Sequence, residues 1–340
     1  MFDFLEPRAQ LDGHSILVTG GTGSFGKRFI KTVAEHYKPS RLIVYSRDEL
    51  KQYEMGLELP VAKNPALRYF IGDVRDAGRL EMAMRGVDLV IHAAALKQVP
   101  TAEYNPFECI ATNVHGAENV VNAAIRTGVK RVVALSTDKA ANPINLYGAS
   151  KLASDKIFIA ANHLAGADGC RFSVVRYGNV IGSRGSVIPL FRRMVAEGAK
   201  ELPITDARMT RFLITLQQGV NFVLSSMSLM RGGEIFVPKI PSMKITDVAA
   251  AIGPKLKSNV IGIRPGEKLH EVLITEEDAW TTYELPDRFV IEPAHAHWEA
   301  KRPAISGANR VAEGFRYDSL NNSEWMPAES LARILQAEPA

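Results

Sequence analysis

The chain is poor in cysteine and has no long apolar run. Its 340 residues include only two cysteines, Cys109 and Cys170, which stand far apart. We therefore predict two reduced, packed thiols rather than a disulfide framework or a cysteine metal site. No apolar stretch approaches the roughly 20 residues that span a bilayer. The acid-bearing N-terminus MFDFLEPRAQ also lacks the apolar core of a signal peptide. We expect a cytoplasmic protein without a membrane span.

An excess of charge of one sign is also missing. Lysine and arginine total 41 against 37 acidic residues, and the basic residues are scattered, with a net charge of +4. No basic run of the kind that follows a nucleic-acid backbone is present, so no nucleic-acid partner is expected. A few arginines can still serve a phosphorylated small molecule. The pair His295 and His297 has no evident third ligand, so we predict no metal site.

What the first half of the chain does have is a regular alternation of strand and helix patterns. Helical patterns, notably 107–127 and 146–164, separate short apolar runs, and this is typical of βαβ units. The runs typical of buried strands are Ser15–Thr19, Arg41–Ser46, Arg68–Ile71, Leu89–His92, Arg131–Ser136 and Phe172–Arg176. The predicted fold is α/β, a Rossmann-like doubly wound parallel sheet with a smaller C-terminal substrate-binding lobe.

The second half is less regular. Residues Gly178–Met209 are rich in glycine, proline and arginine, so loops are predicted there. Helical patterns cover Thr215–Met230 and Thr246–Lys257, and Glu234–Val237 is a predicted strand that returns to the sheet. The predicted division is a cofactor-binding Rossmann domain over 1–177, rejoined by 210–240, and a substrate-binding lobe over 178–209 and 241–340.

A glycine triplet joins the first predicted strand to the first predicted helix. Gly20, Gly23 and Gly26 are spaced three apart at that junction. Glycine there permits a tight turn and a close approach of backbone N–H groups to a pyrophosphate, beside the positive end of a helix. This context makes the triplet a dinucleotide-binding fingerprint. The predicted contacts are Gly20, Thr22, Gly23, Ser24, Phe25 and Gly26.

The end of the second strand predicts which dinucleotide is bound. Folds that bind NAD usually place an acidic residue there for the ribose 2′-hydroxyl. This chain has Ser46 and Arg47, a hydroxyl and a guanidinium that suit a 2′-phosphate, so the predicted cofactor is NADP. Further cofactor contacts are predicted at Asp73, Val74, Ala93, Ala94, Ala95 and Lys97. His92 is predicted to be structural.

Tyr147 and Lys151 begin the helix that follows the fifth strand. Their spacing of four places them on one helical face. A nearby ammonium is expected to lower the pKa of the tyrosine, which can then take a proton from a substrate alcohol while hydride leaves for a nicotinamide. Downstream of a dinucleotide fingerprint, this spacing predicts oxidoreductase-type chemistry.

Taken together, these motifs resemble the extended, nucleotide-sugar-modifying branch of the short-chain dehydrogenase/reductase superfamily. The resemblance implies that Thr137 hydrogen-bonds the reacting oxygen. The adjoining Asp138 and Lys139 look like the acid–base pair of bacterial UDP-N-acetylglucosamine 4,6-dehydratases that invert C5, which open pseudaminic-acid pathways. Other matching segments are Ala93–Pro100, Arg176–Val180, Gly182–Val187, Met209–Phe212 and Arg264–Lys268. A homo-oligomer, with hexamers known among relatives, is implied as well.

The resemblance also implies a mechanism and a product. Tyr147 takes the C4 hydroxyl proton, a neutral Lys139 removes the C5 proton, and a protonated Asp138 donates to the departing C6 hydroxyl. The product from UDP-N-acetylglucosamine is a UDP-2-acetamido-2,6-dideoxy-hexos-4-ulose of L-arabino configuration, and the enzyme is a hydro-lyase. Substrate contacts are predicted at Lys97, Asn179, Arg184, Val187, Thr205, Arg211, Arg264 and Glu267.

Other functions share most of these residues. A UDP-sugar 4-epimerase or a dehydratase that retains C5 needs Gly20, Tyr147 and Lys151, but it need not use Asp138 and Lys139. A non-catalytic NADP-binding sensor is a second class of alternative. The complete set of Thr137, Tyr147 and Lys151 argues against a sensor.

Overall fold

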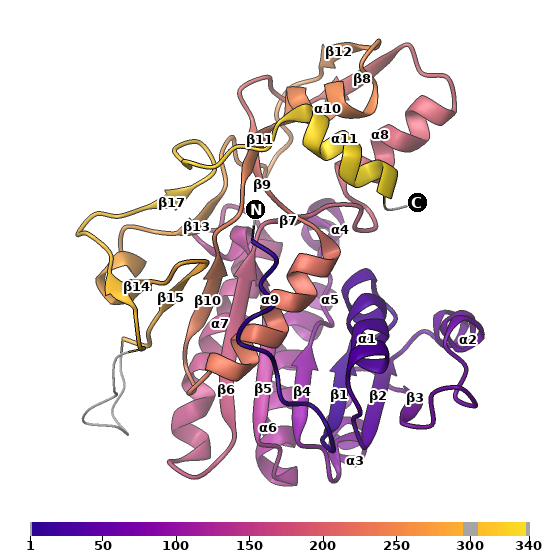
Figure 1. Ribbon diagram of the computed structural model, residues 1–340, viewed down its shortest axis with the longest axis vertical. Coiled ribbons are helices and arrows are strands. Elements are labelled where there is room, and N and C mark those ends of the chain that lie inside the picture. The colour runs from indigo at the N-terminus through magenta and orange to yellow at the C-terminus, as the bar shows by residue number, and fades with distance from the viewer. Residues whose placement is uncertain (1, 295–304, 338–340) are drawn as a thin grey trace.

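A computed structural model describes residues 2–294 and 305–337. His295 and His297, where no metal site is predicted, lie outside the described residues. A mixed sheet forms the centre of the molecule (Figure 1). Its parallel part runs in the order β3 (Leu67–Ile71), β2 (Arg41–Ser46), β1 (Ser15–Thr19), β4 (Leu89–His92), β5 (Arg131–Thr137), β6 (Arg171–Tyr177) and β10 (Ile235–Pro238). The strands β15 (Arg288–Ile291), β14 (Thr282–Glu284) and β16 (Asn309–Arg310) continue it in antiparallel fashion.

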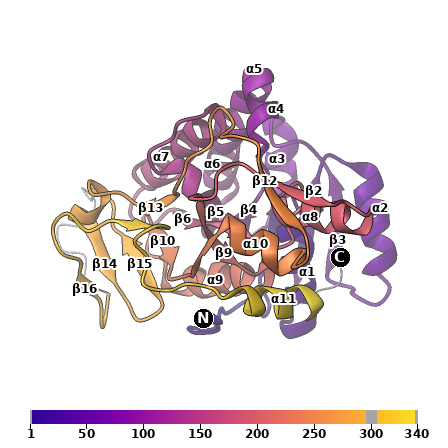
Figure 2. The same ribbon diagram turned by 90° about the horizontal axis from the view of Figure 1, so that it is seen from above.

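Helices cover both faces of this sheet (Figures 1 and 2). On one face α1 (Ser24–His36) packs against α9 (Leu216–Leu229), and on the other α6 (Gly116–Thr127) packs against α3 (Ala77–Met84) and α7 (Leu146–Ala165). The remaining helices of this half are α2 (Glu49–Glu58), α4 (Val99–Tyr104) and α5 (Pro106–Ile110), and a π-helical turn over Ala111–His115 joins α5 to α6. The predicted doubly wound fold is confirmed.

Local capping explains where the helices begin. The Asp48 side chain accepts a hydrogen bond from the Lys51 N–H and starts α2, and Asn145 caps α7 through the Gly148 N–H. Thr215 and Gln218 form a reciprocal capping box at α9. The Asn145 cap fixes the first turn of α7, which is the turn that carries Tyr147.

A second hydrophobic core forms the smaller lobe. Its buried members, which include Ile188, Phe191, Leu202 and Val248, pack apart from the main core. The lobe contains β7 (Asn179–Val180), α8 (Val187–Ala196), β8 (Glu201–Ile204), β9 (Thr210–Ile214), β11 (Ser242–Lys244), α10 (Ile245–Ile252), β12 (Lys257–Val260) and α11 (Ala328–Ala337). The pair β13 (Val272–Ile274) and β17 (Tyr317–Asp318), with short 3₁₀ turns at Asp138–Ala140 and Asp278–Thr281, completes the described elements.

Three details differ from the sequence prediction. The region predicted as loops contains α8 and β8, because apolar side chains at Ile188 and Leu202 supply the second core. The predicted helix to Lys257 ends at Ile252, where Gly253 and Pro254 interrupt it. The division of the chain was also too simple, since β14, β15 and β16 belong to the main sheet rather than to the lobe.

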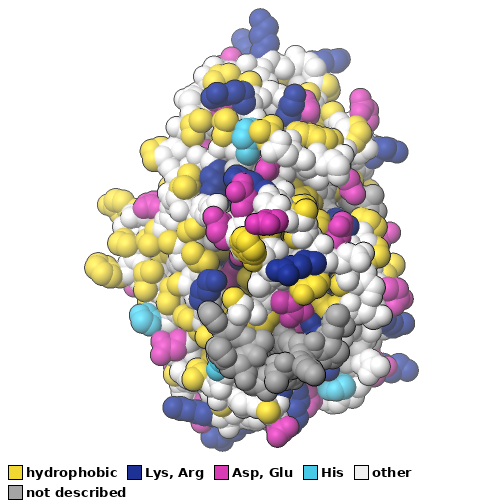
Figure 3. Space-filling model, turned by 90° about the vertical axis from the view of Figure 1, so that its left-hand side faces the viewer, with side chains coloured by type: hydrophobic (Ala, Val, Ile, Leu, Met, Phe, Trp, Pro, Cys, Tyr) yellow, Lys and Arg dark blue, Asp and Glu magenta, His cyan; other side chains and the backbone are white. Residues whose placement is uncertain are grey.

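The surface carries both charge signs. On the side of β14 and β15, basic and acidic side chains are interspersed (Figure 3). Among the described residues, no helix has the length and apolar character needed to cross a bilayer.

Candidate active site

A cleft of about 1110 Å³ lies between the carboxyl ends of the parallel strands and the lobe. A smaller cavity of about 190 Å³ adjoins the loops after β1, β2, β3 and β4. The predicted cofactor and substrate residues all line one or both cavities, and of the predicted catalytic residues only Asp138 does not, because it is completely buried. The fold therefore brings the predicted site residues to one edge of the sheet, as the topology of such sheets favours.

The glycine loop is shaped by close backbone packing. Gly20 has a φ of +65°, and a Cβ atom placed there would lie 2.8 Å from the Ala94 nitrogen. At Gly26 a Cβ would lie 2.6 Å from the Gly20 carbonyl oxygen, whereas at Gly23 the nearest atom would be that same oxygen at 3.2 Å. The loop leaves its backbone open to the cleft at the start of α1, as a pyrophosphate site requires.

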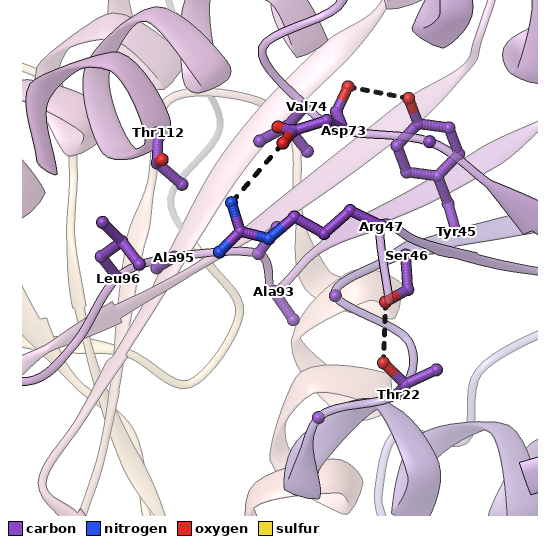
Figure 4. Close-up of a pocket in the computed structure, with 14 residues that line it drawn as sticks. Thr22, Tyr45, Ser46, Arg47, Asp73, Val74, Ala93, Ala95, Leu96 and Thr112 are labelled. Carbon is purple, nitrogen blue, oxygen red and sulfur yellow. Dashed lines mark hydrogen bonds and ion pairs between the residues drawn. The ribbon is translucent and has the colours of Figure 1, made fainter. Parts of the chain in front are cut away.

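The small cavity is lined by the residues predicted to determine the dinucleotide (Figure 4). The Thr22 and Ser46 hydroxyl oxygens are 2.7 Å apart, and the half-exposed Arg47 guanidinium lies 3.5 Å from the Asp73 carboxylate. Burial disfavours the charged form of Asp73, but hydrogen bonds from Arg75 outweigh this and hold its pKa below the usual range. Arg47 thus lies across the cavity and is held there by a weak contact.

Thr112 is a member of this cavity that the sequence reasoning missed. Its hydroxyl is buried and has no hydrogen-bond partner among the described residues. A buried polar atom without a partner is costly. The side chain comes from the π-helical turn before α6, and no local sequence signal marks it as a site residue.

His92 is structural, as predicted. Its ring is buried at the end of β4, and its Nδ1 lies 2.9 Å from the Thr19 hydroxyl. Burial, reinforced by the charge of Lys151, lowers the pKa of His92 to about 3. The neutral ring fixes Thr19, whose hydroxyl accepts hydrogen bonds from the N–H groups of Ala93 and Ala94. This chain of contacts sets the backbone that faces Gly20.

Tyr147 and Lys151 lie on α7 and are both buried, in contact with the cleft. Burial raises the pKa of Tyr147 to about 12, although the charge of Lys139 and a hydrogen bond with Thr137 act in the opposite direction. The pKa of Tyr147 is therefore raised rather than lowered as expected, because desolvation of the phenol outweighs the nearby charges. Burial also lowers the pKa of Lys151 itself, and Asp155 partly opposes that shift.

A buried polar network supports this helix from behind. The Ser136 hydroxyl donates to Asp155 at 2.7 Å, and Arg176 lies 3.5 Å from the same carboxylate. Arg176 also donates to the Leu273 carbonyl at 3.1 Å. The network links β5, α7 and β6 beneath the cleft, and the sequence reasoning did not predict Asp155 as part of it.

The acid–base pair is joined by a third residue, Glu271. The Lys139 Nζ lies 3.1 Å from the Asp138 carboxylate and 3.0 Å from the Glu271 carboxylate. Burial by itself would lower the pKa of Lys139, but the two carboxylates outweigh it and raise the pKa. The neutral Lys139 expected from the mechanism is therefore not the resting form. Burial raises the pKa of Asp138, in the direction that the mechanism needs.

The predicted substrate residues come from β7, α8 and β9 of the lobe, from the loops after β7, β8 and β12, and from the loop after β4 of the Rossmann half. Arg264 and Glu267 contact each other at 3.8 Å, and the Arg184 side chain is exposed to the cleft. Arg211 is buried and donates to the carbonyl oxygens of Thr210 and Leu269. Of the predicted substrate contacts that carry a positive charge, Lys97, Arg184 and Arg264 are thus more accessible than Arg211. Asn179, Val187, Thr205 and Lys97 also line the cleft.

Asn179 and Ser186 carry buried side-chain oxygens that lack hydrogen-bond partners among the described residues. Both residues line the cleft. Such oxygens are available to a polar ligand, since leaving them buried and unpaired is unfavourable. In the described ranges, no cluster of metal-ligating side chains is present.

Comparisons with known proteins agree with this geometry. The family model described as "Polysaccharide biosynthesis protein" matches residues 16–293. UDP-N-acetylglucosamine 4,6-dehydratase (inverting) of Campylobacter jejuni is 57% identical over 94% of this chain and 97% of its own length. UDP-glucose 4-epimerase of Rickettsia canadensis is 44% identical over 94% of this chain and 95% of its own length.

Solved structures show the same architecture. Pen from Bacillus thuringiensis superposes with a TM-score of 0.88 at 35% identity and covers 96% of this chain and 98% of its own. DesIV, a dTDP-glucose 4,6-dehydratase from Streptomyces venezuelae solved with NAD bound, gives a TM-score of 0.65 at 26% identity and covers 75% of this chain and 86% of its own. The resemblance inferred from the motifs is confirmed: the chain belongs to the polysaccharide biosynthesis protein family and to the same sequence family as the inverting UDP-N-acetylglucosamine 4,6-dehydratase of Campylobacter jejuni.

Proposed function

We propose that this protein is a hydro-lyase that removes water from UDP-N-acetylglucosamine across C4 to C6 and inverts C5. The product is a UDP-2-acetamido-2,6-dideoxy-hexos-4-ulose of L-arabino configuration. The observation that carries the proposal is the contact of Asp138, Lys139 and Glu271 beside Tyr147 and Thr137, in a cleft continuous with the glycine loop. Identity of 57% to a relative named for this reaction supports it.

The residues of the cofactor end fit a dinucleotide. A Cβ atom at Gly20 would fill the space against Ala94, and the Thr112 hydroxyl is a buried oxygen without a partner. We propose NADP, held by the glycine loop and by Ser46 and Arg47 at its 2′-phosphate. Bound there, the nicotinamide would supply an acceptor for the C4 hydrogen and a source of hydride for C6 within the same turnover.

Tyr147 acts first, as the base for the C4 hydroxyl. Thr137 and Lys139 both favour its phenolate and offset part of the effect of burial on its pKa. The Asn145 cap fixes the first turn of α7, and the network around Asp155 ties the middle of this helix to β5 and β6, so the phenol stays at the cleft wall. Oxidation at C4 makes the neighbouring C5 hydrogen acidic, and this prepares the elimination step.

Asp138 and Lys139 carry out that elimination. Lys139 accepts the C5 proton, and Asp138 gives a proton to the C6 hydroxyl, which leaves as water. The proton that Tyr147 took from the C4 hydroxyl equals in number the proton that Asp138 gave, and its return to Asp138 restores both groups for the next turnover. A proton from water then adds to C5 from the opposite face and gives the inverted product, and Lys139 releases to solvent the proton that it took. Both groups need shifted pKa values, and burial supplies the shift for Asp138.

A UDP-sugar 4-epimerase is the second candidate, because a relative with that name is 44% identical. A C5-retaining dehydratase would use the same cofactor end. The epimerase reading gives no reason for a buried carboxylate, an ammonium and a second buried carboxylate in direct contact, since burial of such charges is costly unless they are used or paired. A retaining dehydratase also needs an acid and a base, so the configuration of C5 in the product is what separates it from the proposed reaction.

Incubation with UDP-N-acetylglucosamine in D₂O separates these functions. Dehydration gives a product lighter by one water, with solvent deuterium at C5, and the NMR coupling constants of the product report inversion. Unchanged mass with an altered C4 centre would show epimerisation instead. A dehydrated product with the original C5 configuration would identify the retaining reaction.

The cellular location, assembly and pathway of the enzyme are further parts of the proposed function. We propose a cytoplasmic homo-oligomer, up to a hexamer, that supplies a pathway of the pseudaminic-acid type. Light-scattering mass measurements test the assembly.

A further inference from the structure

Glu271 is a buried carboxylate in direct contact with the acid–base pair, and the mechanism above gives it no step. Its side chain is almost completely buried, directly before β13, and it is 132 residues from Lys139 in the chain. Its Oε1 accepts a hydrogen bond from the Lys139 ammonium at 3.0 Å. Its Oε2 has no hydrogen-bond partner among the described residues.

The Lys139 ammonium contacts two buried carboxylates and belongs to the only side chain of these three that is partly exposed. Asp138 and Glu271 are inaccessible to solvent, whereas a quarter of the Lys139 side chain is exposed, toward the cleft. Two negative charges this close together repel each other, and the ammonium between them offsets that repulsion. The position of Lys139 therefore depends on both carboxylates.

The backbone of Glu271 is anchored. Its N–H donates to the Ser319 hydroxyl at 2.9 Å, and its carbonyl accepts from the Ser319 N–H at 2.9 Å. The Ser319 and Thr210 hydroxyl oxygens are 2.6 Å apart. The Arg211 Nε lies 3.7 Å from the Glu271 Oε1, the same oxygen that Lys139 contacts. The Glu271 carboxylate is consequently held in place, and it can orient the flexible side chain of Lys139.

We propose that Glu271 is a positioning residue of the acid–base pair: it orients the Lys139 ammonium toward Asp138 and keeps a proton within the pair in the ligand-free enzyme. The inference rests on the proposed function, which makes Asp138 the acid and Lys139 the base. It adds to that function an explanation of how Asp138 and Lys139 acquire the protonation states that the reaction needs.

Transfer of one proton converts the resting pair into the reactive pair. An N–H bond of Lys139 breaks and an O–H bond forms on Asp138, across the 3.1 Å hydrogen bond. A carboxylate and an ammonium thereby become a neutral acid and a neutral amine, with no exchange with solvent. A bound sugar excludes water from the cleft and favours the neutral pair, because desolvation penalises charges.

The charge of Glu271 should affect the pH dependence of the enzyme's activity. The pair titrates as a unit, and the other charged or titratable groups that face it are Lys97, Tyr147, Arg211 and Lys268. The negative charge of Glu271 raises the pKa of both members. At a pH below the lower of the two apparent pKa values of this pair, Asp138 is neutral while Lys139 remains an ammonium, and no base is available. Activity is therefore lost on that acidic side.

The test compares the pH dependence of kcat/KM for dehydration in the wild type and in Glu271→Gln. The amide keeps the size and can still accept from Lys139, but it removes the charge. We expect the acid limb to move to lower pH by about one unit or more. Glu276→Gln, which neutralises an exposed carboxylate further along the same segment, is the control and should leave the limb in place.

A second measurement does not depend on turnover. Acetic anhydride labels neutral amines, and mass spectrometry gives the labelling rate of Lys139 relative to the exposed Lys156. We expect Glu271→Gln to raise this ratio about tenfold, as a fall of one pKa unit requires. A wild type that turns over no UDP-N-acetylglucosamine would defeat the proposed function, while the labelling ratio would still decide the role of Glu271.

Glu271→Asp covers the case in which the glutamine variant does not fold. It retains the charge but withdraws it from Lys139, so we expect a smaller shift of the acid limb in the same direction. An acid limb and a labelling ratio equal to those of the wild type in the folded variants would overturn the inference, even if kcat falls.

Discussion

The glycine loop lines the same cleft as Lys139 and Glu271 of the Asp138–Lys139–Glu271 cluster, but the loop and the cluster are sensitive to different changes. In the loop, the space at Gly20 is limited by backbone atoms of Ala93 and Ala94. In the cluster, three side chains from two distant segments hold one another by charge. The loop is a continuous stretch whose shape depends on the absence of side chains, and the cluster depends on their presence. Added volume should therefore damage the first, and a lost charge the second.

The largest effect is expected in the cluster. Lys139→Met removes the proposed base and leaves Asp138 and Glu271 without their ammonium, so kcat for dehydration should fall about 10³-fold or more. Lys156→Met on the exposed side of α7 is the matched control. Product formation is measured by NMR, with thermal unfolding to check the fold. Dehydration at an unaltered rate in Lys139→Met would contradict the mechanism.

A smaller effect is expected from one methyl group in the loop. Gly20→Ala combines a positive φ with a contact of 2.8 Å to backbone, and together these cost about 2 to 4 kcal/mol. Gly23→Ala meets only one atom, at 3.2 Å, and should be milder. Denaturant unfolding and calorimetric binding of NADP measure both. Equal losses in the two variants would show that backbone packing does not govern the loop.

The smallest effect concerns the dinucleotide. Arg47→Leu removes a charged contact proposed for the 2′-phosphate, worth about 1.5 to 3 kcal/mol, so the Kd for NADP should rise about tenfold or more. The Kd for NAD should change little, because that dinucleotide lacks the phosphate. Isothermal titration with both cofactors gives the comparison. If wild-type protein bound NAD more tightly than NADP, the cofactor assignment would be wrong.

Much of the fold could be predicted from local pattern. Strands β1, β2 and β4 have the predicted bounds, because buried parallel strands are short apolar runs between turn signals. The lobe was harder, since its core is assembled from short pieces such as Ile188, Leu202 and Met326 that are distant in the chain. The antiparallel extension by β14, β15 and β16 had no periodic signal of its own.

The site shows the same limit. The spacing of Tyr147 and Lys151 predicted their common location on α7, but the direction of the tyrosine pKa shift was wrong, because burial cannot be measured in a sequence. Glu271 was missed although it lies just beyond the matching segment that ends at Lys268. A single glutamate carries no spacing signal for a partner 132 residues away.

The sequence by itself determined the chemistry that is available: a glycine turn at a strand end, a tyrosine and a lysine one helical turn apart, and an acid beside a lysine. These depend on neighbouring residues, and local stereochemistry governs them. Only the tertiary structure decided the state of those groups. It buried Asp138 and placed Glu271 against Lys139, and it left Thr112 without a partner. Solvent exclusion and contacts between distant segments set proton affinity, and both arise only when the chain is folded.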